Sequence, residues 1–173
     1  MYSFAAREVL KGSTPADKAA AIDDLLEKLR DRKPTYPEFE AAFVELRSSR
    51  VYPQQTQLVR YVLERLHVTV PASSAAHPVA LDQLTVEHLI PQGSRRPATV
   101  PVSDVARVGN LLLVTEELNN ELEDASFAEK KKLLKTVPGI ESEIAGASAW
   151  GSSEILDRSK RMAKLAYEET WKF

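Results

Sequence analysis

The sequence lacks cysteine altogether and holds only three histidines, His67, His77 and His88, among its 173 residues. Without cysteine, disulfides, iron–sulfur clusters, thiolate zinc sites and a cysteine nucleophile are all excluded. No apolar run approaches the roughly 20 residues that a membrane-spanning helix needs. The N-terminus also lacks the pattern of a signal peptide. We therefore expect a cytoplasmic protein with no membrane anchor.

Neither sign of charge dominates the chain. Lys and Arg number 23 against 25 Asp and Glu, which gives a net charge of −2. This balance excludes a general basic coat for nucleic acid but leaves room for a local basic patch. With 43% hydrophobic and 28% charged residues, the composition is typical of a globular protein.

One stretch of the chain is small, uncharged and interrupted by prolines. It reads PASSAAHPVA and covers residues 71–80. Such a composition is typical of a connector. The connector therefore predicts a boundary between two parts of the chain. We expect a helical scaffold over residues 1–70 and a second part over residues 81–173.

The first part carries helical signals throughout. Thr14 and Pro15 followed by Asp17 form the pattern of a helix start, with an N-cap, a proline in the first turn and an early acid. Apolar residues then recur at helical spacing. Helices are predicted over about residues 15–33, 35–46 and 54–66.

The second part mixes strand and helix signals. Residues 84–86 and 108–114 are apolar and rich in β-prone types, so each predicts a strand. Ser126 followed by Glu129 has the spacing of a capping box, which predicts a helix through Leu134. A last helix is predicted from about residue 153 to residue 171. The fold class is therefore α+β and mostly helical.

Several polar residues stand at the ends of these predicted elements. Taken singly, each has an ordinary explanation, such as a half-buried pair, a turn or a helix cap. Neighbouring residues of a regular strand point to opposite faces, but at a strand end they can share a site. The residues concerned are Glu87-His88 with Pro91 beyond, Gly109-Asn110, Asn119-Asn120 and Lys130.

Their order and spacing resemble those of the HNH (His-Me finger) nucleases. The matching segments read E-H-L-I-P-Q, V-G-N-L-L-L-V, L-N-N and S-F-A-E-K-K. More closely, the chain resembles the C-terminal domain of GmrSD-type modification-dependent restriction proteins, including SspE-like nucleases, over about residues 50–173. The resemblance implies a ββα-metal core between N- and C-terminal helices. It also implies a metal-dependent DNA endonuclease that restricts phage or other foreign DNA.

The resemblance also implies roles for individual residues. His88 is the expected general base, since an imidazole has a pKa near neutrality. Glu87 and Asn119 are the expected ligands of Mg²⁺ or Mn²⁺, which prefer oxygen donors, and Asn120 competes with Asn119 for the second position. The remaining catalytic positions are Asn110, expected to pin the loop that holds the histidine, and Lys130, expected to neutralise phosphate charge. A solvated helix face is the alternative interpretation of Lys130 and the lysines beside it.

Basic residues near the motif are candidates for DNA contact. Phosphate contacts of this kind position a duplex without reading its bases. Because acids outnumber bases even around the motif, we expect weak, salt-sensitive binding. The candidates are Arg95, Arg96, Arg107 and Lys131.

Full-length members of the family that the chain resembles also carry an N-terminal nucleotide-hydrolysing sensor domain. Its D-G-Q-Q-R segment is not found in this sequence. We therefore expect this chain to be the effector part of a larger modification-sensing protein; the alternative is that a partner chain supplies the sensor. Because a single HNH site cuts one strand, nicking by a monomer is the simpler expectation. Two alternatives remain open: a non-catalytic HNH-derived module that binds DNA or protein, and a purely structural helical domain.

Overall fold

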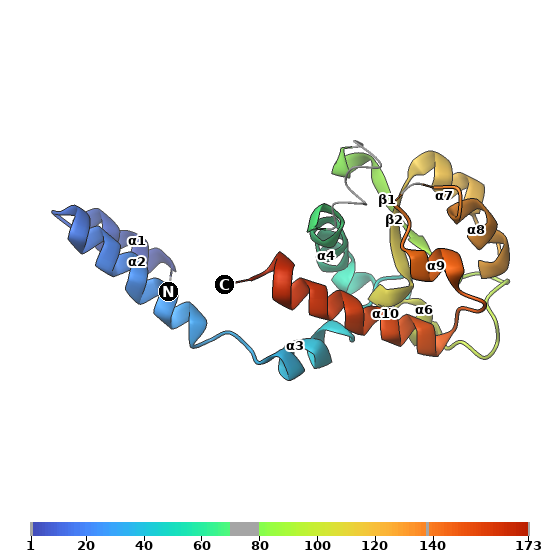
Figure 1. Cartoon of the computed structure of the whole chain (residues 1–173), viewed down its shortest axis with the longest axis horizontal. Helices are drawn as coiled ribbons and strands as arrows, with labels where there is room; N and C mark the ends of the chain where they lie inside the picture. Colours follow the sequence, from blue (N-terminus) through green and yellow to red (C-terminus); the bar gives the residue numbers. More distant parts are fainter. Residues whose placement is uncertain (1, 70–79, 138, 173) are drawn as a thin grey trace. The chain divides into compact units, whose positions relative to one another are not determined.

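The computed structural model describes residues 2–69, 80–137 and 139–172 (Figure 1). The chain forms two compact units, one within residues 1–35 and the other within residues 36–172. Of the predicted connector, only Ala80 falls within the described residues. None of the described helices is both long and apolar enough to span a bilayer.

The first unit is a pair of helices, α1 (Tyr2–Lys11) and α2 (Pro15–Arg30), which lie side by side in Figure 1. The predicted start of α2 is confirmed. Thr14 is its N-cap, the Asp17 amide donates to the Thr14 hydroxyl over 3.1 Å, and the Asp17 carboxylate accepts from the Thr14 amide over 2.9 Å. This reciprocal capping box satisfies two backbone donors at the helix end.

The second unit is built around a two-stranded antiparallel sheet. Strand β1 (Leu84–His88) pairs with β2 (Leu111–Thr115), and His88 lies opposite Leu111 in the register. Before the sheet come α3 (Tyr36–Phe43), η1 (Pro53–Gln55), α4 (Thr56–Thr69) and η2 (Leu81–Gln83). Between the strands lie α6 (Val102–Val105) and η3 (Val108–Asn110). After β2 follow α7 (Glu116–Leu122), α8 (Phe127–Leu134), α9 (Ser142–Gly146), α10 (Ser152–Leu165) and η4 (Ala166–Thr170).

Two apolar clusters fill this unit. One joins the residues after β1 to α7, α8 and α9, and includes Leu89 and Leu122. The other joins α3, α4, β2 and α10, and includes Phe43, Val62 and Met162. Because α3 and α4 bury their apolar faces in the second cluster, they belong with the sheet, and the compact unit begins at residue 36. The predicted domain boundary at residue 71 lies inside it.

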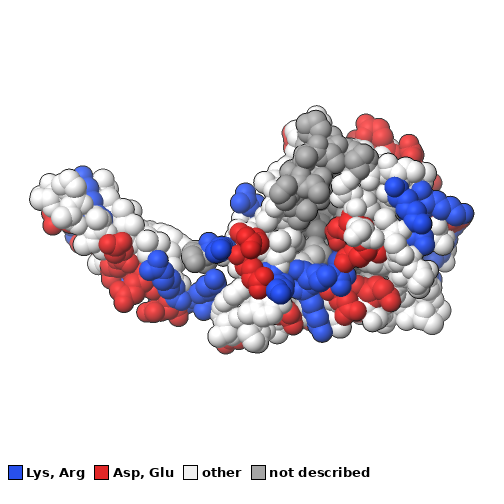
Figure 2. Space-filling view, viewed as in Figure 1, with Lys and Arg blue, Asp and Glu red and all other residues white. Residues whose placement is uncertain are grey.

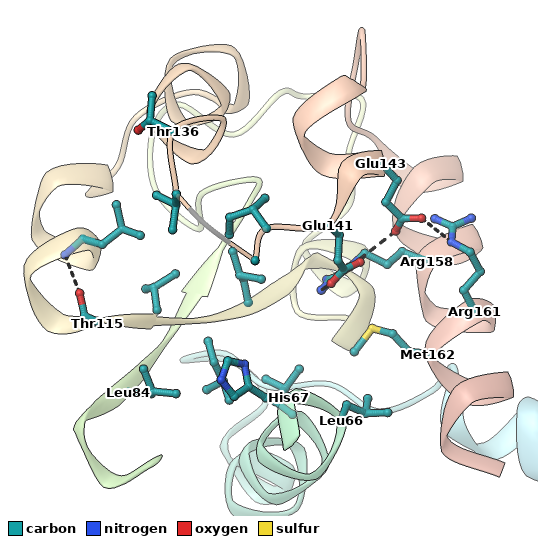
Figure 3. Close-up of a pocket in the computed structure, with 18 of the residues that line it drawn as sticks. Leu66, His67, Leu84, Thr115, Thr136, Glu141, Glu143, Arg158, Arg161 and Met162 are labelled. Carbon is teal, nitrogen blue, oxygen red and sulfur yellow. Dashed lines mark hydrogen bonds and ion pairs between the residues drawn. The ribbon is translucent and has the colours of Figure 1, made fainter. Parts of the chain in front are cut away.

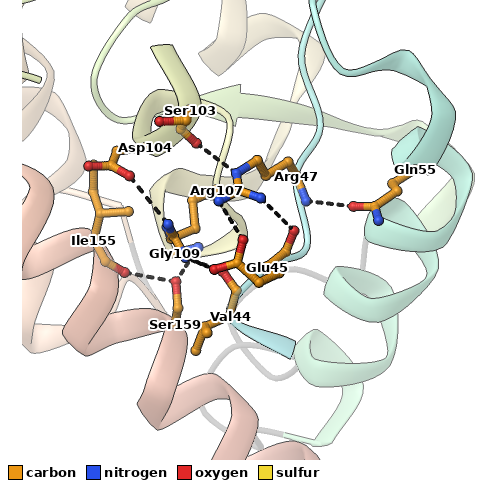
Figure 4. Close-up of polar contacts among 10 residues, drawn as sticks. All are labelled: Val44, Glu45, Arg47, Gln55, Ser103, Asp104, Arg107, Gly109, Ile155 and Ser159. Atoms are coloured by element: carbon orange, nitrogen blue, oxygen red, sulfur yellow. Dashed lines mark hydrogen bonds and ion pairs between the residues drawn. The ribbon is translucent and has the colours of Figure 1, made fainter. Parts of the chain in front are cut away.

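Helix α10 closes over the loop that precedes β2 (Figure 4). The Ser159 hydroxyl accepts a hydrogen bond from the Gly109 amide over 3.1 Å and donates to the Ile155 carbonyl over 2.8 Å. A Cβ atom on Gly109 would overlap the Ile155 carbonyl oxygen. This close approach therefore requires glycine in η3.

The expectation of an α+β, mostly helical fold is confirmed, as is the order strand, loop, strand, helix. The predicted capping box at Ser126 and Glu129 is present at the start of α8. Helices α1, α7 and α9 were not predicted. The last two are short, with seven and five residues, so their sequences hold too few turns for helical periodicity to stand out.

Candidate active site

His88 is the last residue of β1, and both nitrogens of its ring have partners. Its Nε2 atom lies 3.1 Å from the carbonyl oxygen of Ser48, in the loop after α3. Its Nδ1 atom lies 3.3 Å from the side-chain amide nitrogen of Gln92. A carbonyl oxygen only accepts hydrogen bonds, so Nε2 carries the proton and Nδ1 is the acceptor.

A second contact fixes the Gln92 amide in this orientation. Its Oε1 atom accepts a hydrogen bond from the backbone amide of Arg50 over 3.2 Å, which leaves its NH₂ group to face His88. Asn and Gln orientations are assigned from such networks. The loop after α3 thus holds the imidazole directly through Ser48 and indirectly through Arg50.

Burial lowers the pKa of His88 to about 4, and the nearby Lys130 charge acts in the same direction. The hydrogen bond to the Ser48 carbonyl opposes this shift because it favours the protonated ring. At neutral pH the imidazole is therefore uncharged, with a lone pair on Nδ1. That is the protonation state that a general base requires.

Asn110 is fully buried and ties together the two ends of the loop between the strands. Its side-chain oxygen accepts from the Ile90 amide over 2.8 Å. Its NH₂ group donates to the carbonyl oxygens of Ile90, over 3.0 Å, and Val105, over 2.8 Å. Asn110 therefore fixes the backbone just beyond His88.

Glu87 and Lys130 form a buried ion pair. The Lys130 ammonium contacts a Glu87 carboxylate oxygen and also donates to the His88 carbonyl oxygen over 2.8 Å. Burial raises the pKa of Glu87, and its contact with Lys130 opposes that shift. Only 1% of Lys130 is exposed. In this conformation its charge is directed to β1, where it balances Glu87, and is covered from solvent.

The contacts of Glu87 and His88 diverge, as expected for neighbours in a strand. Glu87 faces α8, whereas the His88 ring faces the loop after α3. The two candidate asparagines lie on α7, which packs against β1. Asn119 is half-buried and Asn120 is exposed.

The described residues contain no group of three or more His, Asp or Glu side chains that could hold a metal ion. A cation at β1 would therefore rely on Glu87, an amide oxygen of α7 and oxygen atoms from water or phosphate. This donor set is all oxygen, and it fits Mg²⁺ or Mn²⁺ rather than a softer metal.

The four predicted DNA-contacting residues are all engaged within the chain. The Arg107 side chain, 12% exposed, binds the Val44 carbonyl, Glu45 and Asp104 (Figure 4). Arg96 donates to the Val100 carbonyl, and Lys131 donates to the Ala147 carbonyl over 2.6 Å. Arg95 pairs with Glu129, but its side chain stays 56% exposed.

Other bases are better presented to solvent. Lys132 and Lys135 on and after α8 are exposed, and Figure 2 shows a group of basic side chains over this helix. The contacts of Arg107 with Val44 and Glu45 are long-range and left no local signal, whereas its partner Asp104 is only three residues away.

Sequence reasoning also missed Ser48, Arg50 and Gln92. Gln92 stands four residues after His88, within the E-H-L-I-P-Q segment, so its position was a usable signal. Ser48 and Arg50 lie about 40 residues before His88, in a loop with no recognisable motif. Long-range contacts bring that loop to the site: α3 packs against α10, and Leu46 and Ser48 pair through their backbones with Val108 and Ala106.

A cavity of about 550 Å³ lies elsewhere in the second unit (Figure 3). Apolar residues of α4, β2 and α10, among them Leu66 and Met162, form much of its lining. Glu141 and Arg158 form an ion pair of 2.6 Å at its wall. Neither His88 nor the other predicted site residues line this cavity, and its apolar wall does not suit a phosphate backbone.

Comparison with protein-family models identifies the family to which the chain belongs. Residues 36–165 match the family model of the GmrSD restriction endonucleases, C-terminal domain. This span is most of the chain, so the chain belongs to that family and carries a restriction-endonuclease-type domain. The match begins where the second compact unit begins. No curated protein and no solved structure matched the chain.

Proposed function

We propose that this chain is a metal-dependent DNA endonuclease that acts in the restriction of phage or other foreign DNA, with His88 as its general base. The observation that supports this is the state of the imidazole. It is neutral, its Nε2–H is committed to the Ser48 carbonyl, and its basic position is Nδ1, which accepts from the Gln92 amide. Hydrolysis of a phosphodiester begins with removal of a proton from water by such a base.

In this mechanism Nδ1 of His88 takes the proton of the attacking water. The Gln92 amide, which donates to Nδ1 in the absence of DNA, gives up this contact when the water arrives. Asn110 keeps the backbone after His88 in place through two hydrogen bonds to Ile90 and ties it to Val105 through a third. Lys130 acts as a positioning residue, because its ammonium holds the His88 carbonyl and the Glu87 carboxylate together.

Glu87 and Asn119 would hold the metal, in a ββα-metal core made of β1, β2 and α7. A bound Mg²⁺ or Mn²⁺ supplies positive charge for the phosphate oxygens and the leaving 3′ oxygen. Burial raises the pKa of Glu87 and the contact with Lys130 opposes that shift. A cation at Glu87 would compete with the Lys130 ammonium for the carboxylate. Asn119 is preferred to Asn120 because it is half-buried and thus better restrained.

The proposed substrate is DNA, held mainly through its phosphates. Arg95, Lys132 and Lys135 are exposed bases of the motif region, and acids offset them there. Binding by this chain alone should therefore be weak and salt-sensitive. A nucleotide-hydrolysing sensor domain of a larger protein is the proposed source of discrimination between DNAs.

A supercoiled-plasmid assay tests the proposal. The parent chain and His88→Ala are compared with Mg²⁺ or Mn²⁺, with EDTA as a control and His67→Ala as a matched histidine variant. The parent and His67→Ala should give relaxed or linear DNA only with metal, and His88→Ala should give none. Equal cleavage by His88→Ala, or no cleavage by the parent with either metal, would contradict the proposal.

A second candidate is a non-catalytic module that binds DNA or protein. The inward contacts of Lys130 and Arg107 favour it, because they leave fewer charges for substrate. Calorimetric titration with Mn²⁺ separates the two. The nuclease requires binding that Glu87→Gln weakens, whereas the module predicts no binding that depends on Glu87.

A further inference from the structure

The helical pair of the first unit buries very little of its own surface. Among the described residues of α1 and α2, Ala5 alone is buried. Tyr2 is 67% exposed and Leu10 is 84% exposed, while Ile22 and Leu26 on α2 are 47% and 37% exposed. Units of fewer than about 40 residues rarely form a sufficient core without a partner. This pair of helices therefore leaves an apolar surface to be covered.

Exposed apolar residues lie along both helices of the pair, and Phe4, which is 53% exposed, lies beside Lys28. Tyr2 and Leu10 are eight residues apart on α1, and Ile22 and Leu26 are four residues apart on α2, so each set forms a stripe along its helix. The ion pairs Lys11–Glu8 on α1 and Lys28–Asp24 on α2 lie on other faces of these helices. Lys28 also lies 5.8 Å from the Phe4 ring centre.

Charge along α2 is distributed unevenly. Residues 15–24 contain three acids and one base, whereas residues 25–30, which complete the helix, contain one acid and two bases. Figure 2 shows acidic and basic side chains gathered in separate patches on this part of the chain. A helix that is acidic in one half and basic in the other is complementary to an antiparallel copy of itself.

Two unpartnered charges flank the apolar stripe of α2. Asp23 and Arg30 are exposed, and within the described parts of the chain neither side chain makes a hydrogen bond or an ion pair. They are seven residues apart and so lie on the same helix face, beside Ile22 and Leu26. In an antiparallel pair of α2 helices related by a two-fold axis near Leu26, Asp23 of each copy meets Arg30 of the other.

We propose that the apolar face of α1 and α2 binds a second copy of this chain. The two copies pair through antiparallel α2 helices, with Ile22 and Leu26 in the interface and two symmetric Asp23–Arg30 ion pairs at its border. A two-fold interface uses the same surface on both copies, which a self-complementary helix satisfies. If the proposed nuclease activity is correct, one dimer carries two sites, one for each DNA strand.

Sedimentation equilibrium of the full chain tests whether two copies form this dimer. The parent should sediment as a dimer. Ile22→Asp with Leu26→Asp should give a monomer. The matched variant Lys28→Glu, which changes the net charge by the same amount on the opposite side of α2 beside Asp24, should remain a dimer. A monomeric parent, or equal loss of the dimer in both variants, would overturn the proposal.

A charge swap tests the orientation independently of the apolar core. Asp23→Arg should weaken the dimer about tenfold or more, because it places two arginines together at both symmetric positions. Adding Arg30→Asp to the same chain should restore it, since the pair is re-formed with reversed signs and the net charge equals that of the parent. A dimer that survives the single change, or that the double change does not restore, contradicts the antiparallel arrangement.

Because the chain has no cysteine, a single introduced thiol gives an unambiguous cross-link. Leu26→Cys lies near the proposed axis and should form a disulfide-linked dimer on mild oxidation, whereas Ala20→Cys should not. Disulfide cross-linking does not depend on DNA cleavage, so its result tests the dimer even if the nuclease assay fails. Cross-linking of Ala20→Cys to the same extent as Leu26→Cys would contradict the proposed interface.

Discussion

The Nε2 atom of His88 lies 3.1 Å from the carbonyl oxygen of Ser48, a residue 40 positions earlier in the chain. This contact determines which nitrogen of the imidazole is basic. It commits Nε2–H to the backbone and leaves Nδ1 to accept a proton. The orientation of the proposed base therefore depends on a loop that lies far from the motif in sequence.

The low pKa of His88 predicts the pH dependence of cleavage. Because that pKa is about 4, the fraction of neutral imidazole stays high well below pH 6.5. The rate of cleavage at saturating Mg²⁺ should therefore hold through pH 5.5 and fall only as pH approaches about 4. An acidic limb centred on pH 6.5 would show that His88 is solvated or is not the base.

The same shift has a consequence for stability. The pKa of His88 is lower in the folded chain than in the unfolded chain, so between about pH 4 and pH 6.5 the unfolded chain binds more protons at this residue. The stability contributed by neutral His88 is complete above pH 6.5 and declines as pH falls toward 4. Urea denaturation of the parent and His88→Gln at pH 7 and pH 5 measures it, and the glutamine variant should lose less stability between the two.

Gln92→Glu should raise the pKa of His88. The parent amide donates to Nδ1, whereas a carboxylate at that position attracts the imidazolium. We expect the acidic limb of the rate profile, and the NMR titration of the ring, to move toward higher pH. Gln92→Leu, which removes the contact without adding charge, is the control. If both variants titrate alike, the Gln92 side chain does not face Nδ1.

The buried pair of Glu87 and Lys130 predicts a double-mutant cycle. Lys130→Met leaves a buried carboxylate without its partner and should cost about 3–5 kcal/mol of folding free energy. Adding Glu87→Gln removes the uncompensated charge and should recover a large part of that loss. Urea denaturation of the four proteins gives the coupling energy. Additive losses would mean that the two side chains do not interact in solution.

Much of the local structure could be predicted from sequence, because its causes are local. The capping boxes at Thr14 and Ser126 depend on residues three positions apart, and both are present. The two strands of the sheet were also predicted, although the second was expected to begin at residue 108 and residues 108–110 instead form η3. The direction of Lys130 was not predictable, since its carboxylate partner is 43 residues away and a lysine on a helix is ordinarily solvated.

The same reasoning applies to the boundary of the nuclease-like unit. A proline-rich, uncharged stretch is a reasonable signal for a connector, and it predicted a new domain at residue 81. The apolar face of α4 instead packs with α10, nearly a hundred residues later, so the unit extends back to residue 36. Sequence periodicity reveals that a helix has an apolar face, but it does not reveal which element covers that face.

Gly109→Ala tests the closure of α10 over the loop that holds Asn110. An added methyl group would overlap the Ile155 carbonyl oxygen and come within 2.8 Å of the Ser159 amide nitrogen, and backbone atoms of a packed helix cannot easily move. We expect a loss of about 1–3 kcal/mol or more in unfolding free energy, together with reduced cleavage. Gly146→Ala is the matched control, because nothing lies within 4 Å of its added Cβ. Equal stability of the two variants in thermal or urea denaturation would show that α10 does not pack this closely against η3.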